Sequence, residues 1–183
     1  MEYDGWSFLM MLCLEKSTLV DLIKISSEHY REENKDQLDN SPTMSIHTIT
    51  EWNSFGMSVE DISVADDCCN EVFFWYLHIE YFNELKTVTI GNHCFDFIEK
   101  VVIGFLPKLA SFRVGERCFA GKQFDRLRIG GNMLLHDCLE LQEIVIGNRS
   151  FCNFYSCTLE SISFSLVFIF RITQFGIPSI WSS

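Results

Sequence analysis

The chain has 183 residues, a formal net charge of −11 at pH 7, 48% hydrophobic residues and 17 phenylalanines. This apolar content excludes a chain that is disordered throughout, and the length is enough for one domain with a substantial core. The acidic balance argues against nucleic acid as a partner, because affinity for phosphate comes from lysine and arginine side chains.

Residues 17–33 predict a short N-terminal helix. A hydroxyl residue can cap its start, and apolar side chains such as Leu19 and Ile23 share one face. A charged stretch then runs to a turn at Pro42. We therefore assign residues 1–58 to an N-terminal helical or irregular cap and linker.

An eleven-residue phrase follows and occurs four times, at 59–69, 85–95, 109–119 and 141–151. Its first position and positions +3 and +5 are apolar, position +6 is Gly or Ala, and position +10 is Cys or Phe. Copies that recur every 24 to 32 residues predict a stacked solenoid, in which neighbouring copies bury one another's apolar faces.

Within each phrase, apolar residues two apart predict a β-strand. Two such residues point to the same side of a sheet, and the residue between them points away. We expect Val88, Ile90, Val114 and Ile146 to share one apolar column, with Thr89 on the outward side.

A second set of strands is expected between the phrases, because the same spacing of apolar residues recurs there. Its members are residues 74–79, 98–104, 124–130 and 159–164. The stretch after residue 129 is longer than its counterparts, so we assign 130–137 to a loop inserted on one face of the stack.

The template ends near residue 164, so the predicted repeat region is 59–164. Residues 165–183 fit no copy of the template and are either a C-terminal cap or a tail foreign to the fold. Leu166, Phe168 and Phe170 alternate with other residues and are candidates for the cap, because a repeat array needs a shield over its last copy.

No segment is expected to span a membrane or direct secretion. The stretch Phe164–Phe170 is largely apolar but far shorter than the ~20 residues that a bilayer requires. Phe8–Leu14 is also apolar, but Glu2 and Asp4 stand where a secretory signal carries positive charge.

The eight cysteines predict buried free thiols. Cys68, Cys94 and Cys118 share position +9, where Ser150 stands in the fourth copy, so small size is the shared property and not disulfide bonding. Cysteine and histidine spacings predict no zinc site, and we expect no metal and no cofactor. Reduced thiols indicate an intracellular, cytoplasmic protein.

The phrase Leu-x-x-Ile-x-Ile-Gly-x-x-Ser-Phe at 141–151 resembles the leucine-rich repeat superfamily, and most closely the irregular repeats of BspA-like and related protist proteins. The resemblance covers about 59–164. It implies a β-rich α/β solenoid, a leucine-rich-repeat-like parallel β stack, to which the short N-terminal helix is added. The family's usual Asn at +8 is replaced throughout, and we expect Cys or Ser at +9 to take over its bonds to the backbone.

The resemblance also implies a non-enzymatic scaffold that binds another protein through one face, with no catalytic residues. Outward strand positions would carry this recognition. The predicted partner-binding residues are Lys86, Thr87, Thr89, Ser111, Arg113, Gln142, Glu143 and Val145.

Two alternatives stay open at this point. One is a parallel β-solenoid enzyme that acts on polysaccharide, which would need clustered carboxylates; the best cluster, Glu60, Asp61, Asp66 and Asp67, more resembles a solvated edge. The other is a fragment with no independent function, which the unpatterned residues at both ends of the chain would suit.

Overall fold

The structure is a computed structural model that describes residues 41–52, 54–120, 131–163 and 165–170. All of them belong to the second of two compact units, which comprises residues 38–183. The predicted helix at 17–33 and the predicted strand at 124–130 lie outside the described residues.

Nearly all regular secondary structure in the described part of the chain is β-strand. Its elements are β1 (Thr43–Ile46), α3 (Ile49–Trp52), β2 (Asp61–Val64), β3 (Tyr76–Glu80), β4 (Thr87–Ile90), β5 (Lys100–Gly104), β6 (Ser111–Val114), β7 (Gly131–Cys138), β8 (Glu143–Ile146), β9 (Phe154–Ile162) and β10 (Val167–Phe170).

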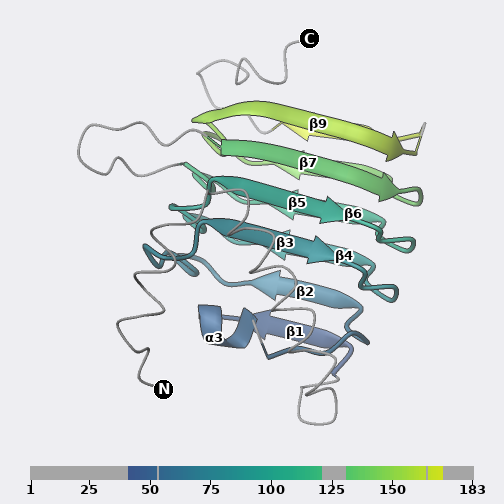
Figure 1. Ribbon diagram of the computed structural model, residues 1–183, viewed down its shortest axis with the longest axis horizontal. Helices are drawn as coiled ribbons and strands as arrows, with labels where there is room; N and C mark the ends of the chain where they lie inside the picture. The colour runs from purple at the N-terminus through teal and green to yellow at the C-terminus, as the bar shows by residue number, and fades with distance from the viewer. Residues whose placement is uncertain (1–40, 53, 121–130, 164, 171–183) are drawn as a thin grey trace, which may run out of the picture. The chain divides into compact units, whose positions relative to one another are not determined.

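These strands pair in parallel, as the sequence predicts, and they form two separate sheets, which the sequence left open. One sheet has the order β1-β2-β4-β6-β8-β10 and the other β3-β5-β7-β9. From β2 to β10 the chain alternates between the two sheets, so each strand pairs with the strand two places along the sequence. Figure 1 shows the strands side by side, with β1 at one end of the series and β9 beyond β7 at the other.

The predicted apolar column is confirmed. Val88 pairs with Phe112 and Phe112 with Ile144, while Ile90, Val114 and Ile146 form the next row. These six side chains are 0–3% exposed and belong to one core cluster. Strand alternation places these residues on one side of the sheet, and parallel in-register pairing places equal positions of successive copies next to each other.

Phenylalanines at position +10 form a second column. The rings of Phe95 and Phe119 stack with centroids 5.1 Å apart, and those of Phe119 and Phe151 with centroids 4.5 Å apart. All three side chains are fully buried, and each contributes roughly 1.5–3 kcal/mol of transfer free energy.

Glycine at position +6 serves close backbone approach. A Cβ on Gly147 would lie 2.2 Å from the carbonyl oxygen of Gly115, the glycine of the preceding copy. The left-handed backbone occurs later in the phrase, at +8 and +10, where Arg117 and Phe119 have φ of 55° and 53°. The turn therefore places non-glycine residues in the left-handed region and uses glycine for space.

The prediction for position +9 is also confirmed. The Cys94 Sγ donates to the Ala65 carbonyl at 3.0 Å, and the Cys118 Sγ to the Gly91 carbonyl at 2.9 Å. The Ser150 Oγ donates to the Gly115 carbonyl at 2.7 Å. A thiol or hydroxyl at this position thus satisfies the carbonyl at +6 of the preceding copy.

Two predicted assignments in the second sheet are wrong. Residues 131–138 form β7 and not an inserted loop, with Met133 and Leu135 paired to Val101 and Ile103. The reason is spacing: Leu135 precedes Cys138 by three residues, as Ile103 precedes Leu106, so only this register reaches the next phrase correctly.

The last strand of the second sheet is also displaced from its prediction. Cys157 and Leu159 pair with Met133 and Leu135, so β9 begins before the predicted strand at 159–164. The prediction placed Ile162 in the middle of the strand, whereas Ile162 pairs with Cys138, the last residue of β7.

The six-stranded sheet extends on both sides of 59–164. In β1, Met44 pairs with Ile62, and in β10, Phe168 pairs with Ile144. Leu166 and Phe168 pack against the core cluster. Residues 167–170 therefore continue the sheet although Ser165 and Arg171 stand where the template has leucine and glycine.

Candidate functional site

The predicted binding residues come together on the outward face of the six-stranded sheet. Thr87, Ser111 and Glu143 form one register row, and Thr89, Arg113 and Val145 form the row two residues further on. Lys86 and Gln142 directly precede their strands and are exposed. The residues named here lie on neighbouring strands because the pairing is parallel and in register.

Val145 differs from its prediction. It lies on the outward face, in the row of Arg113 and Ile169, but only 7% of it is exposed. A β-branched residue between the long side chains of two neighbouring strands is covered by them. Val145 therefore forms part of the floor of this face and does not present a free side chain.

The cation at Lys86 is paired on this face. Its Nζ donates to Glu60 Oε2 at 2.5 Å, and this bond raises the pKa of the Lys86 ammonium. Beside it, Thr87 Oγ1 donates to Asp61 Oδ1 at 2.6 Å. Two acidic residues of the predicted carboxylate cluster thus serve as partners for the neighbouring strand.

The second cation is paired in the same way. Glu143 Oε1 accepts from Ser111 Oγ at 2.8 Å, from Arg113 Nε at 3.0 Å and from Arg113 Nη2 at 2.5 Å. These bonds, that from Ser111 first, lower the pKa of the Glu143 carboxyl. The three side chains are held in one arrangement across β6 and β8.

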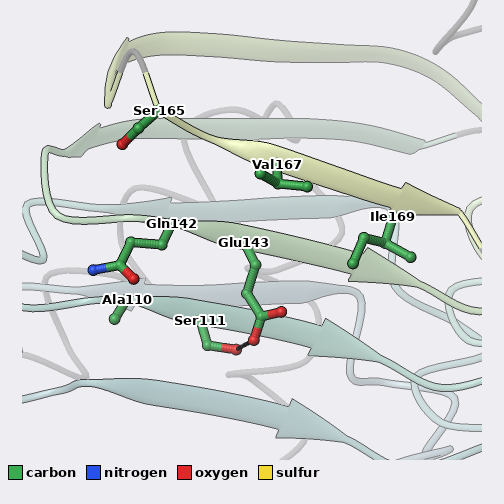
Figure 2. A pocket seen from close by; sticks show the side chains of 7 residues that line it. All are labelled: Ala110, Ser111, Gln142, Glu143, Ser165, Val167 and Ile169. Atoms are coloured by element: carbon green, nitrogen blue, oxygen red, sulfur yellow. Dashed lines mark hydrogen bonds between the residues drawn. The ribbon is translucent and has the colours of Figure 1, made fainter.

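A hollow of about 620 Å³ lies beside this triad, over β6, β8 and β10. Its lining residues are Ala110, Ser111, Gln142, Glu143, Ser165, Val167 and Ile169. Figure 2 shows the Ser111–Glu143 hydrogen bond on one side of the hollow and the aliphatic side chains of β10 on the other.

The sequence located only part of this hollow. Ser111, Gln142 and Glu143 were predicted, whereas Val167 and Ile169 were not, because the template does not extend to β10. Their alternation with Phe168 is the signal that could have identified them as outward residues. Val167 is 55% exposed and Ile169 42% exposed, so this end of the face is apolar and open.

The remaining members of the acidic cluster have structural partners. Asp66 Oδ1 accepts from the backbone N–H of Asn92 at 2.7 Å, which lowers the pKa of the Asp66 carboxyl. Asp67 lies 3.4 Å from the His93 ring nitrogen. Among the residues that the structure describes, no cluster of His, Cys, Asp or Glu could hold a metal ion.

Three of the described thiols are poorly suited to nucleophilic chemistry. Burial raises the pKa of Cys69, Cys138 and Cys157 to about 12, so these groups are protonated at neutral pH.

In the described ranges, no helix is long and apolar enough to cross a membrane.

The second sheet carries a buried charged group that the sequence did not indicate. Glu80 accepts from His136 Nε2 at 2.8 Å and contacts His78 Nε2, and its side chain is 2% exposed. Glu80 on β3 and His136 on β7 are both register partners of Gly104 on β5. Their side chains can meet across β5 because Gly104 has no side chain; a Cβ there would lie 2.3 Å from the His136 ring. The ring of Phe105 lies perpendicular to the His136 imidazole, with the two ring centroids 4.8 Å apart.

Comparison of the chain with models of known protein families, with curated proteins and with solved structures finds no match. The resemblance to leucine-rich repeats therefore remains a prediction from the repeated phrase.

Proposed function

We propose that the two sheets are the two sides of a leucine-rich-repeat-like solenoid, and that the protein is a non-enzymatic scaffold for another protein. The single observation that carries this proposal is the outward face of the six-stranded sheet. It combines hydrogen-bonding side chains at fixed positions with an open apolar hollow, a mixture typical of protein-binding surfaces.

The pairing of charges on this face indicates how it recognises a partner. Lys86 is neutralised by Glu60, and Arg113 by Glu143. A face with paired charges adds little long-range attraction, so the affinity would come from the fixed hydrogen-bonding side chains, Lys86 and Arg113 among them, and from apolar contact at Val167 and Ile169. We expect partner binding to depend only weakly on salt concentration.

The use of the cysteines supports an intracellular site of action. The Cys94 and Cys118 thiols donate hydrogen bonds to backbone carbonyls, a role that only the reduced thiol can perform. We therefore infer that the protein works in a reducing compartment such as the cytoplasm.

The proposal is tested by quantitative affinity capture with three forms of the full chain. The face variant is Lys86→Glu with Arg113→Glu, and the matched control is Lys108→Glu, which breaks the Lys108–Glu84 ion pair of 2.6 Å in a turn outside the face. We expect a protein that the wild type and the control retain and that the face variant loses by at least about ten-fold.

Melting temperatures should stay close together, because exposed ion pairs contribute about 0–1 kcal/mol each. Equal capture by all three forms would contradict the proposal, as would the absence of any protein retained above the background of the matrix.

A further inference from the structure

We propose that this chain forms a two-fold symmetric dimer, in which β9 pairs antiparallel with β9 of a second copy. The site is the β9 edge of the four-stranded sheet, beyond which the described residues place no further strand. This surface is separate from the outward face of the six-stranded sheet, so the dimer leaves that face open.

This edge strand is long and exposed. β9 has nine residues, the most of any strand in the described ranges, and β7 is the one strand it pairs with there. At the opposite edge, β3 has five residues, four of them buried. Proteins usually keep edge strands short, charged or interrupted by proline, since a free edge is a template for another strand.

The composition of β9 also suits strand addition. Glu160 is its one charged residue and it contains no proline. Tyr155 is 70% exposed and Leu159 39% exposed, so apolar surface accompanies the unpaired backbone groups. These properties are unfavourable for an edge that faces water and favourable for one that adds a strand.

The sequence of β9 is complementary to itself in an antiparallel pair. An antiparallel pair centred on Thr158 places Thr158 opposite its own copy, which is a favourable cross-strand pair. Cys157 and Leu159 both lie on the core side of β9, and Cys157 of one copy then faces Leu159 of the other across the axis. Glu160 faces Ser156, so no like charges meet.

The same register closes the core. Cys157 and Ile162 are partly buried side chains that pack against the core cluster from this end of the sheet. A second copy that continues the sheet beyond β9 would cover their remaining exposed surface and that of Leu159. The dimer thus supplies the shield that the last copy of a repeat array requires.

The test measures the mass of the full chain in solution by light scattering over a roughly hundred-fold range of concentration. Wild type should shift from monomer to dimer. Thr158→Lys and Thr158→Glu should each raise the dissociation constant at least about ten-fold, because like charges meet at the axis. An equimolar mixture of the two variants should dimerise again, since lysine then faces glutamate.

Thr89→Lys is the matched control, because Thr89 is an exposed threonine in β4 on the other sheet. This variant should dimerise like wild type, and circular dichroism should confirm that all variants are folded. A wild type that stays monomeric throughout the range would overturn the proposal. So would a Thr158→Lys variant with the affinity of wild type, or a mixture of the two variants that remains monomeric.

Discussion

The Sγ of Cys118 lies 2.9 Å from the carbonyl oxygen of Gly91, one copy earlier in the chain. The next copy makes the same bond with Ser150 Oγ and the Gly115 carbonyl. The contact explains why position +9 is Cys or Ser in the four copies: both side chains are small and carry one hydrogen-bond donor.

This explanation predicts unequal effects of two small substitutions. Cys118→Ser should change the free energy of unfolding by less than about 1 kcal/mol, because serine makes the bond in the fourth copy. Cys118→Ala should cost about 1–2 kcal/mol, since the part-buried Gly91 carbonyl loses its donor. Urea denaturation measures both. The control is Cys152→Ala at an exposed site, and equal losses for Cys118→Ser and Cys118→Ala would refute the hydrogen-bond account.

The phenylalanine column predicts a large cost for one central truncation. Phe119→Ala should reduce the free energy of unfolding by about 3–5 kcal/mol, because the ring is fully buried between Phe95 and Phe151. Phe73→Ala is the control, since Phe73 is 78% exposed, and it should cost under about 0.5 kcal/mol. Similar losses at the two positions would argue against the column.

Gly104 should be required for the contact between Glu80 and His136. Gly104→Ala is expected to cost about 3 kcal/mol, because the displaced imidazole leaves a buried carboxylate without one of its partners. In a His136→Ala background the same change should cost less than about 1 kcal/mol, and this double-mutant cycle isolates the contact. An equal cost in both backgrounds would assign the effect to the backbone instead.

Glu143 should titrate below the usual range for a glutamate. Its pKa is lowered in the folded chain by the bonds from Ser111 and Arg113, so its contribution to stability is present above the unfolded pKa and is lost as pH falls through the folded pKa. Side-chain NMR measures this titration. Ser111→Ala should raise the Glu143 pKa toward its ordinary value, whereas Ser63→Ala, on the same face but outside the triad, should leave it unchanged.

The sequence predicts those parts of the fold that follow from the two-residue spacing of apolar side chains and from the recurrence of the phrase. Val88 and Ile90 lie two apart in a phrase that recurs, so their strand, its parallel neighbours and the outward position of Thr89 all follow from alternation. The role of position +9 also follows, since Cys and Ser share size and a donor proton and little else.

The parts that it does not predict depend on register and on distant partners. β7 and β9 have weaker apolar patterns, and their alignment is set by the spacing to the next turn, which the stretch around 121–130 obscures. Val145 looks outward by alternation, yet the neighbours on β6 and β10 bury it. Glu80 and His136 lie on β3 and β7, with β5 between them, so no local sequence pattern indicates their contact.

The central claim is that the copies lie side by side in one register. The most direct test is the distance between spin labels introduced through unnatural amino acids at Ser45 and Ile169, which lie in the same row of β1 and β10. Five strand spacings of about 4.8 Å predict a narrow distance distribution centred near 24 Å, broadened only by the label linkers. A mean beyond about 35 Å, or a broad distribution without a peak, would contradict the parallel stack.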